Sequence, residues 1–61
     1  MKRRDLEKRM RRYGCSLKRE GGKHSIWHNP DNGATVPVPR HTEIAEVLAR
    51  KICKDLGIPP P

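Results

Sequence analysis

Residues 15–38 read CSLKREGGKHSIWHNPDNGATVPV, and this stretch predicts a small sheet. Apolar and polar residues alternate over Cys15–Glu20 and again over His24–His28, which is the pattern of strands with one buried face. Gly21 and Gly22 lie between the two segments and suit a tight turn. The first two strands are therefore expected to form a hairpin.

A second turn is predicted over Asn29–Gly33, because an Asn-Gly pair supplies the positive φ that hairpins need. The third strand is predicted over Ala34–Val38. Pro37 cannot donate a hydrogen bond to a ladder, so this strand is expected to lie at an edge of the sheet or to end there.

Amphipathic helices are predicted on both sides of the strands. Residues 2–13 place Leu6, Met10 and Tyr13 at helical spacing, and Gly14 follows as a stop. Thr42 is expected to cap a second helix. The apolar stripe of that helix consists of Ile44, Val47, Leu48, Ile52 and Leu56. Gly57 should end it.

The resulting α-β-β-β-α order predicts an α+β fold, with a three-stranded antiparallel sheet and both helices packed on one of its faces. Double-stranded-RNA-binding domains have the same order of elements. A chain of 61 residues can hold one such domain, which we place at residues 1–58. Ile58 and the prolines after it cannot continue the helix; they are expected to form a short tail that could be disordered, with 59–61 outside the domain.

The charge of the chain favours a polyanionic partner. Lysine and arginine number 14 against 7 acidic residues, which gives a net charge of +7. The basic side chains of the first helix form either a solvated face or a rim that follows phosphates. No apolar leader or membrane-spanning run is present, so a reducing cytoplasm is expected, and Cys15 and Cys53 are interpreted as small core residues.

Four short motifs occur in a restrictive order: Gly21–Trp27, Pro30-Asp31, Val36–His41 and Ile52–Ile58. Together they resemble the HicA toxin family, over about residues 6–58. The resemblance implies an endoribonuclease that cleaves mRNA, a HicB-type antitoxin as protein partner, and a catalytic histidine at the position of His24. Lys23 departs from the Ser or Gly that often precedes that histidine.

The chemistry of RNA cleavage suits His24. An imidazole can accept or donate a proton near neutral pH, and RNA supplies its own nucleophile, the 2′-hydroxyl beside the scissile phosphate. No metal or cofactor is then required. His24 would be general base or acid, while Lys23, Arg19 and Arg40 are candidates to bind phosphate because they lie near it in sequence. Small residues at Gly21 and Gly22 would let an RNA backbone approach.

The other histidines have plainer interpretations. His24 and His28 are separated by about 13 Å along a strand, too far to share a metal ion. His41 could bind phosphate or transfer the second proton, although a capping or surface role is the commoner one for such a residue. Trp27 is out of phase with His24 and should point to the opposite face of its strand, into the core.

Two other functions compete with cleavage. A non-catalytic module that binds double-stranded RNA would share the fold, but the final helix is expected to begin with Thr42–Glu46, whose two carboxylates would repel a phosphate groove. A DNA-binding regulator needs a helix-turn-helix or ribbon-helix-helix pattern, and neither is found. The chain is expected to be a monomer when free of its antitoxin.

Overall fold

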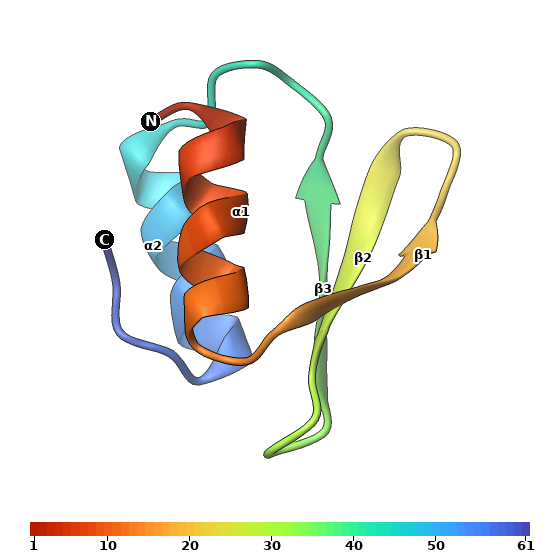
Figure 1. Ribbon diagram of the computed structural model, residues 1–61. Helices are drawn as coiled ribbons and strands as arrows, with labels where there is room; N and C mark the ends of the chain where they lie inside the picture. Colours follow the sequence, from red (N-terminus) through yellow and green to blue (C-terminus); the bar gives the residue numbers. More distant parts are fainter.

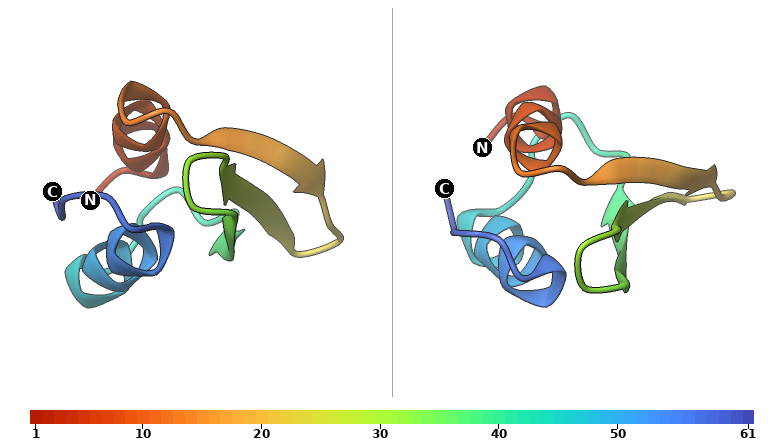
Figure 2. Two further views of the ribbon diagram at one scale, coloured as in Figure 1. Left: turned by 90° about the horizontal axis from the view of Figure 1, so that it is seen from below. Right: turned by 60° about the horizontal axis from the view of Figure 1, so that its bottom comes forward.

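A computed structural model describes the whole chain, residues 1–61. Both helices lie on the same face of a single antiparallel sheet, whose strands are ordered β1-β2-β3 (Figures 1 and 2). The elements are α1 (Arg3–Arg12), β1 (Ser16–Glu20), β2 (His24–Asn29), β3 (Ala34–Pro39) and α2 (Glu46–Leu56). The predicted order and the α+β fold are confirmed.

The central strand β2 separates core residues from candidate site residues. Ser25, Trp27 and Asn29 are buried toward the helices, whereas His24 is exposed and His28 is half-buried on the other face. Side chains alternate across a strand, so this division follows directly from the sequence spacing. The prediction that Trp27 and His24 point to opposite faces is confirmed.

The two outer strands differ in how they are covered. β3 is an edge strand in which Pro37 pairs with Ile26, and it continues to Pro39, so the first of the two expectations for Pro37 holds. All five residues of β1 are exposed, and its register with β2 shifts between Leu17 and Arg19. The β1–β2 hairpin therefore projects beyond the helices, as Figure 1 shows.

The core lies between the sheet and the two helices. α1 contributes Leu6 and Met10, and β3 contributes Val36 and Val38. α2 contributes Ala49, Ile52, Cys53 and Leu56. Both cysteines are free and buried, which confirms their interpretation as core residues. No helix is both long and apolar enough to cross a membrane.

We predict that neither thiol reacts readily in the folded protein. Burial raises the pKa of the Cys15 and Cys53 thiols, and the thiolate is the reactive form. A domain of this size is rarely stable by more than about 3–5 kcal/mol, so labelling by a thiol reagent at neutral pH should be slower than in denaturant by up to about 10²–10³-fold. Mass spectrometry counts the labelled thiols over time. Rapid labelling of one thiol in the folded chain would contradict the packing of that cysteine.

The second helix begins later than the sequence indicated. α2 starts at Glu46 with Ala45 as its N-cap, and no side chain caps it, so the expectation that Thr42 is the cap is wrong. Residues 42–44 instead pair with the start of the chain: Arg3 N–H donates to the Thr42 carbonyl at 2.9 Å, and Ile44 N–H donates to the Met1 carbonyl at 2.7 Å. This extended pairing holds residues 42–44 outside the helix.

The C-terminal end is also more firmly held than expected. Gly57, with a φ of 74°, ends α2 as predicted, but Ile58 is only 7% exposed and belongs to the core. The Arg9 guanidinium donates hydrogen bonds to the carbonyls of Pro59 and Pro60. The expected loose tail is thus wrong for Ile58, and the next two residues are bound to α1.

Candidate active site

His24 opens strand β2 immediately after the hairpin turn, and the turn places it. Gly21 N–H donates a hydrogen bond to the His24 carbonyl at 2.8 Å. A Cβ on residue 21 would lie 2.9 Å from that same oxygen, closer than real Cβ atoms approach, whereas a Cβ on Gly22 would meet nothing within 4 Å. Gly21 is therefore required by the turn itself, and Gly22 is not.

We predict that the two glycines respond differently to alanine. Gly21→Ala should lower the free energy of unfolding by about 1–2 kcal/mol, because the backbone at His24 must shift to admit the methyl group. Gly22→Ala should change it by about 0.5 kcal/mol or less. Both substitutions lower the conformational entropy of the unfolded chain to the same extent. The difference between the two free energies of unfolding, measured in urea, therefore reports the steric clash at residue 21. Equal losses in the two variants would count against this geometry.

Arg40, which directly follows β3, binds the hairpin turn. Its guanidinium forms an ion pair with Glu20 at 2.9 Å and donates hydrogen bonds to the carbonyls of Gly21 and Gly22. The other carboxylate oxygen of Glu20 accepts a hydrogen bond from the buried Ser25 hydroxyl at 3.0 Å. Part of the donor capacity of Arg40 is thus used within the protein, to hold the segment that carries Lys23 and His24.

His24 and His41 line the same open cleft, which has a volume of about 540 Å³. The cleft lies between the end of the sheet where β2 begins and β3 ends and the segment that leads into α2, and His41 comes from that segment. Neither imidazole has a hydrogen-bond partner within the protein. The remaining walls are Pro37, Pro39, Glu43, Ile44, Ala45 and Leu48.

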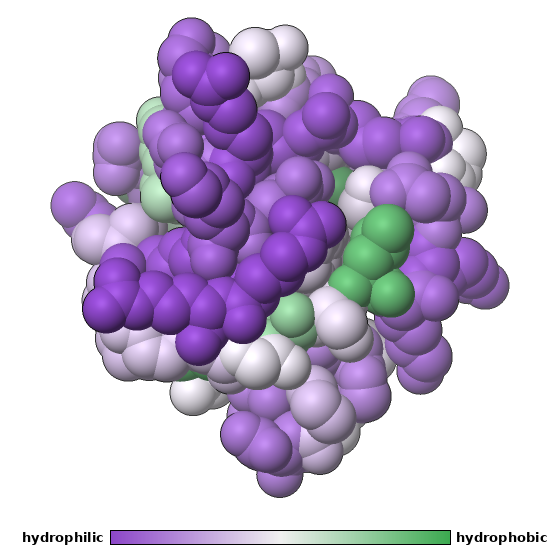
Figure 3. Space-filling model, in the orientation of Figure 1, coloured by the Kyte–Doolittle hydropathy of each residue, from purple (hydrophilic) through white to green (hydrophobic).

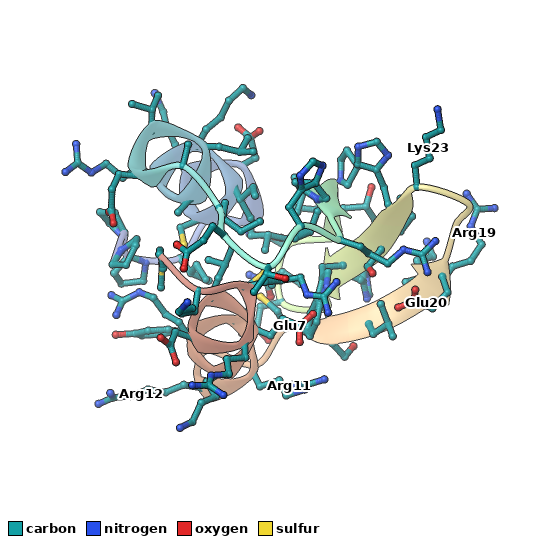
Figure 4. All side chains as sticks on the ribbon, turned by 90° about the horizontal axis from the view of Figure 1, so that it is seen from above. Glu7, Arg11, Arg12, Arg19, Glu20 and Lys23 are labelled. Carbon is teal, nitrogen blue, oxygen red and sulfur yellow. The ribbon has the colours of Figure 1, made fainter.

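A second, more open cleft adjoins the first and shares His41 with it. Its other lining residues are Gly22, Lys23, Arg40 and Thr42. Lys23 forms no ion pair or hydrogen bond in the protein and extends outward from the hairpin turn (Figure 4). An anion in this cleft would meet the uncommitted ammonium group of Lys23 and the guanidinium of Arg40, part of whose donor capacity is already used by the turn.

Arg19 lines neither of these two clefts. It lines a separate cleft with Lys18, Ile26 and Thr35, on the open face of the sheet. Figure 4 shows Arg19 and Lys23 leaving the hairpin in different directions. Of the candidates predicted from the sequence, the structure therefore gathers His24, Lys23, Arg40 and His41, together with the turn glycines, and leaves Arg19 apart.

Glu43 also lines the cleft, and the sequence gives no sign of this, because the helical pattern places Glu43 at the start of the final helix. Lys2 Nζ lies 2.7 Å from its carboxylate, and this hydrogen bond lowers the pKa of Glu43 and raises the pKa of Lys2. The i,i+3 and i,i+4 pattern gives no signal for a pairing between residues so far apart in the chain. The carboxylate of the cleft is thus ionised at neutral pH and bound to a cation.

Cationic side chains also lie on α1, and some of them make contacts within the protein. Figure 4 shows Arg11 and Arg12 on the side of this helix that faces away from α2. The face seen in Figure 3 is mostly hydrophilic, and its most strongly apolar atoms lie to the right of the centre. The Arg11 guanidinium lies 5.0 Å from the centre of the Trp27 ring. No group of three or more His, Cys, Asp or Glu side chains is arranged to bind a metal ion.

The geometry offers two imidazoles in one cleft, with basic groups beside them, which is a set of groups that can move protons next to a bound phosphate. Comparison with known proteins gives one match: a family model described as the HicA toxin of bacterial toxin-antitoxin covers residues 3–58. No curated protein and no solved structure matches the chain.

Proposed function

The chain belongs to the HicA toxin family, and from this we propose that it is the toxin of a toxin-antitoxin module and acts as an endoribonuclease that cleaves mRNA with His24 as the catalytic residue. The observation that carries the proposal is the place of His24. Its imidazole is exposed, lines a cleft, makes no hydrogen bond within the protein, and lies next to the basic cleft lined by Lys23 and Arg40.

RNA cleavage requires only a few chemical tasks of the protein. The 2′-hydroxyl of RNA is held next to the scissile phosphate, so the protein has to move protons, hold the phosphate and stabilise the added negative charge. His24 serves the first task. Lys23 serves the others, because its ammonium group is uncommitted, and Arg40 contributes donors that the turn does not use.

Arg19 takes a different part in this proposal. Because its cleft lies on the open face of the sheet, it would contact RNA away from the bond that is cut. Removing it should weaken RNA binding and make that binding less sensitive to salt, without changing the chemical step.

Incubation with nucleic acid tests the proposal directly. The purified chain is mixed with a single-stranded RNA and with DNA of the same sequence, each with and without a metal chelator. Cleavage of RNA alone, unaffected by the chelator, is the expected result, because DNA lacks the 2′-hydroxyl and His24 needs no metal to move a proton. Cleavage of DNA as well, or loss of cleavage with chelator, would contradict it.

A non-catalytic module that binds double-stranded RNA remains the second candidate, and one observation favours it. The two carboxylates expected to open the final helix are not arranged that way: α2 begins at Glu46, and Glu43 is paired with Lys2. The repulsion of phosphate at that end is therefore weaker than the sequence suggested. Binding of RNA without cleavage in the same experiment would select this function.

A HicB-type antitoxin is the proposed protein partner, and the free toxin is proposed to be a cytoplasmic monomer. An antitoxin would neutralise the chain by covering His24 and the basic cleft with an acidic or shape-matched surface. Gel filtration of the mixture should give one complex that no longer cleaves RNA. Two independent peaks, with cleavage intact, would count against this partner.

A further inference from the structure

The segment between β3 and α2 presents His41 from a fixed position. On one side of His41, the Arg40 guanidinium is bound to Glu20 and to the turn carbonyls. On the other side, the Thr42 carbonyl accepts a hydrogen bond from Arg3 N–H at 2.9 Å. A residue held on both sides has few backbone conformations available, so the imidazole of His41 is kept at the border of the two clefts.

Three side chains with titratable groups line the cleft of about 540 Å³: His24, His41 and Glu43. The hydrogen bond from Lys2 lowers the pKa of Glu43, and that carboxylate therefore does not exchange protons near neutral pH. Imidazoles do so readily. Proton transfer in this cleft is thus left to the two histidines, and both have ring nitrogens free of partners within the protein.

RNA cleavage by the 2′-hydroxyl requires two proton transfers. As the 2′-oxygen bonds to phosphorus, its proton must be taken up, and as the bond from phosphorus to the 5′-oxygen breaks, that oxygen must receive a proton. The products are a 2′,3′-cyclic phosphate and a 5′-hydroxyl. One neutral imidazole accepts the first proton and one imidazolium donates the second, so the pair ends with its charges exchanged and the protons balance.

We propose that His41 is a second catalytic residue, which forms with His24 the acid–base pair that carries these two protons across the shared cleft. This inference rests on the ribonuclease activity proposed above. His41 then exchanges a proton with the reacting oxygens, which is a different role from capping a helix or binding phosphate.

A sulfur-substituted substrate tests the pair. One RNA oligonucleotide has an ordinary 5′-oxygen at the cleavage site, and its match has sulfur at that bridging position. A thiolate leaves without being protonated, because a thiol is far more acidic than an alcohol. On the oxygen substrate, His24→Ala and His41→Ala should each lower the cleavage rate by about 10²–10⁴. On the sulfur substrate, the variant that lacks the general acid should cleave within about tenfold of the native rate. The variant that lacks the general base should still cleave slowly.

His28→Ala is the matched control, because His28 lies on the same face of β2 as His24 but lines neither cleft. Its rates should equal the native rates on both substrates. Native-like cleavage of the oxygen substrate by His41→Ala would overturn the assignment, as would equal losses on both substrates in both variants, which a purely structural role produces. If the native chain cleaves neither substrate, the proposed ribonuclease activity itself fails.

Discussion

Replacing His24 with alanine is expected to lower the rate of RNA cleavage by about 10²–10⁴, the usual contribution of a positioned acid or base. The imidazole is exposed and makes no hydrogen bond within the protein, so its loss removes proton transfer without leaving a buried polar group unpaired. Cleavage of a labelled oligonucleotide under single-turnover conditions measures the chemical step. Thermal unfolding should be unchanged within about 2 °C, because surface substitutions of this kind cost little stability.

The result is informative only beside a matched variant. His28→Ala removes an imidazole from the same strand and the same face, and because His28 is half-buried it perturbs β2 at least as much as His24→Ala does. We expect native cleavage from His28→Ala. Comparable losses in both variants would mean that the strand as a whole, rather than the His24 imidazole, is needed.

Local periodicity is sufficient to predict the three strands and the two faces of β2, but not the burial of β1, because all five residues of β1 are exposed. The alternation over residues 24–28 places Trp27 in the core and His24 on the other face, and the structure agrees because β2 is the regular central strand. The glycines that end the helices were identified by the same local logic, and Gly14 and Gly57 both have positive φ values. Such features depend on neighbours within one turn or one strand.

The start of the second helix could not be predicted in that way. Thr42 has the side chain of a good N-cap, but its carbonyl is bound by Arg3 N–H from the other end of the chain. Tertiary pairing outweighed local preference there. The same pairing brought Glu43 into the cleft beside Lys2, which no spacing rule connects to it.

In the candidate site, too, some residues could be predicted from local sequence and others depend on tertiary pairing. His24 was identified by resemblance and Lys23 by its position beside it, but nothing in the sequence indicates that His41 shares a cleft with His24. That proximity arises because β3 pairs with β2 in a register that places Pro39 opposite His24, two residues before His41. Arg19 is close to His24 in sequence, yet it pairs with Ile26 in the sheet and lines another cleft with that residue.

Trp27→Ala is expected to lower the free energy of unfolding by about 3–5 kcal/mol, the cost of deleting a large aromatic side chain from a core. Trp27 is 1% exposed and is the largest of the fully buried side chains. A domain of this size is stable by only about 3–5 kcal/mol in total, so the variant should be substantially unfolded at 25 °C. Far-UV circular dichroism during urea titration measures this without relying on tryptophan fluorescence.

Trp27→Phe should cost far less, about 1.5 kcal/mol or below, because two effects oppose each other. The smaller ring loses some buried area, but the substitution also removes the indole Nε1, which is buried without a hydrogen-bond partner. Tyr13→Ala, at an aromatic residue that is 37% exposed, provides the comparison for a ring outside the core and should cost about 1 kcal/mol or less. A loss for Trp27→Phe as large as that for Trp27→Ala would contradict the expected benefit of removing the unpaired indole N–H.

These core variants also bear on the site, because Trp27 and His24 occupy opposite faces of one strand. If the packing of Trp27 only keeps β2 folded, the cleavage rate of each variant should fall in proportion to its folded fraction, and Trp27→Phe should cleave almost as fast as the native chain. If the packing also sets the direction in which His24 points, Trp27→Phe should lose activity while remaining folded. The hydrogen bonds that hold the turn at Gly21 and Arg40 lie outside the core, so the first outcome is the one we expect.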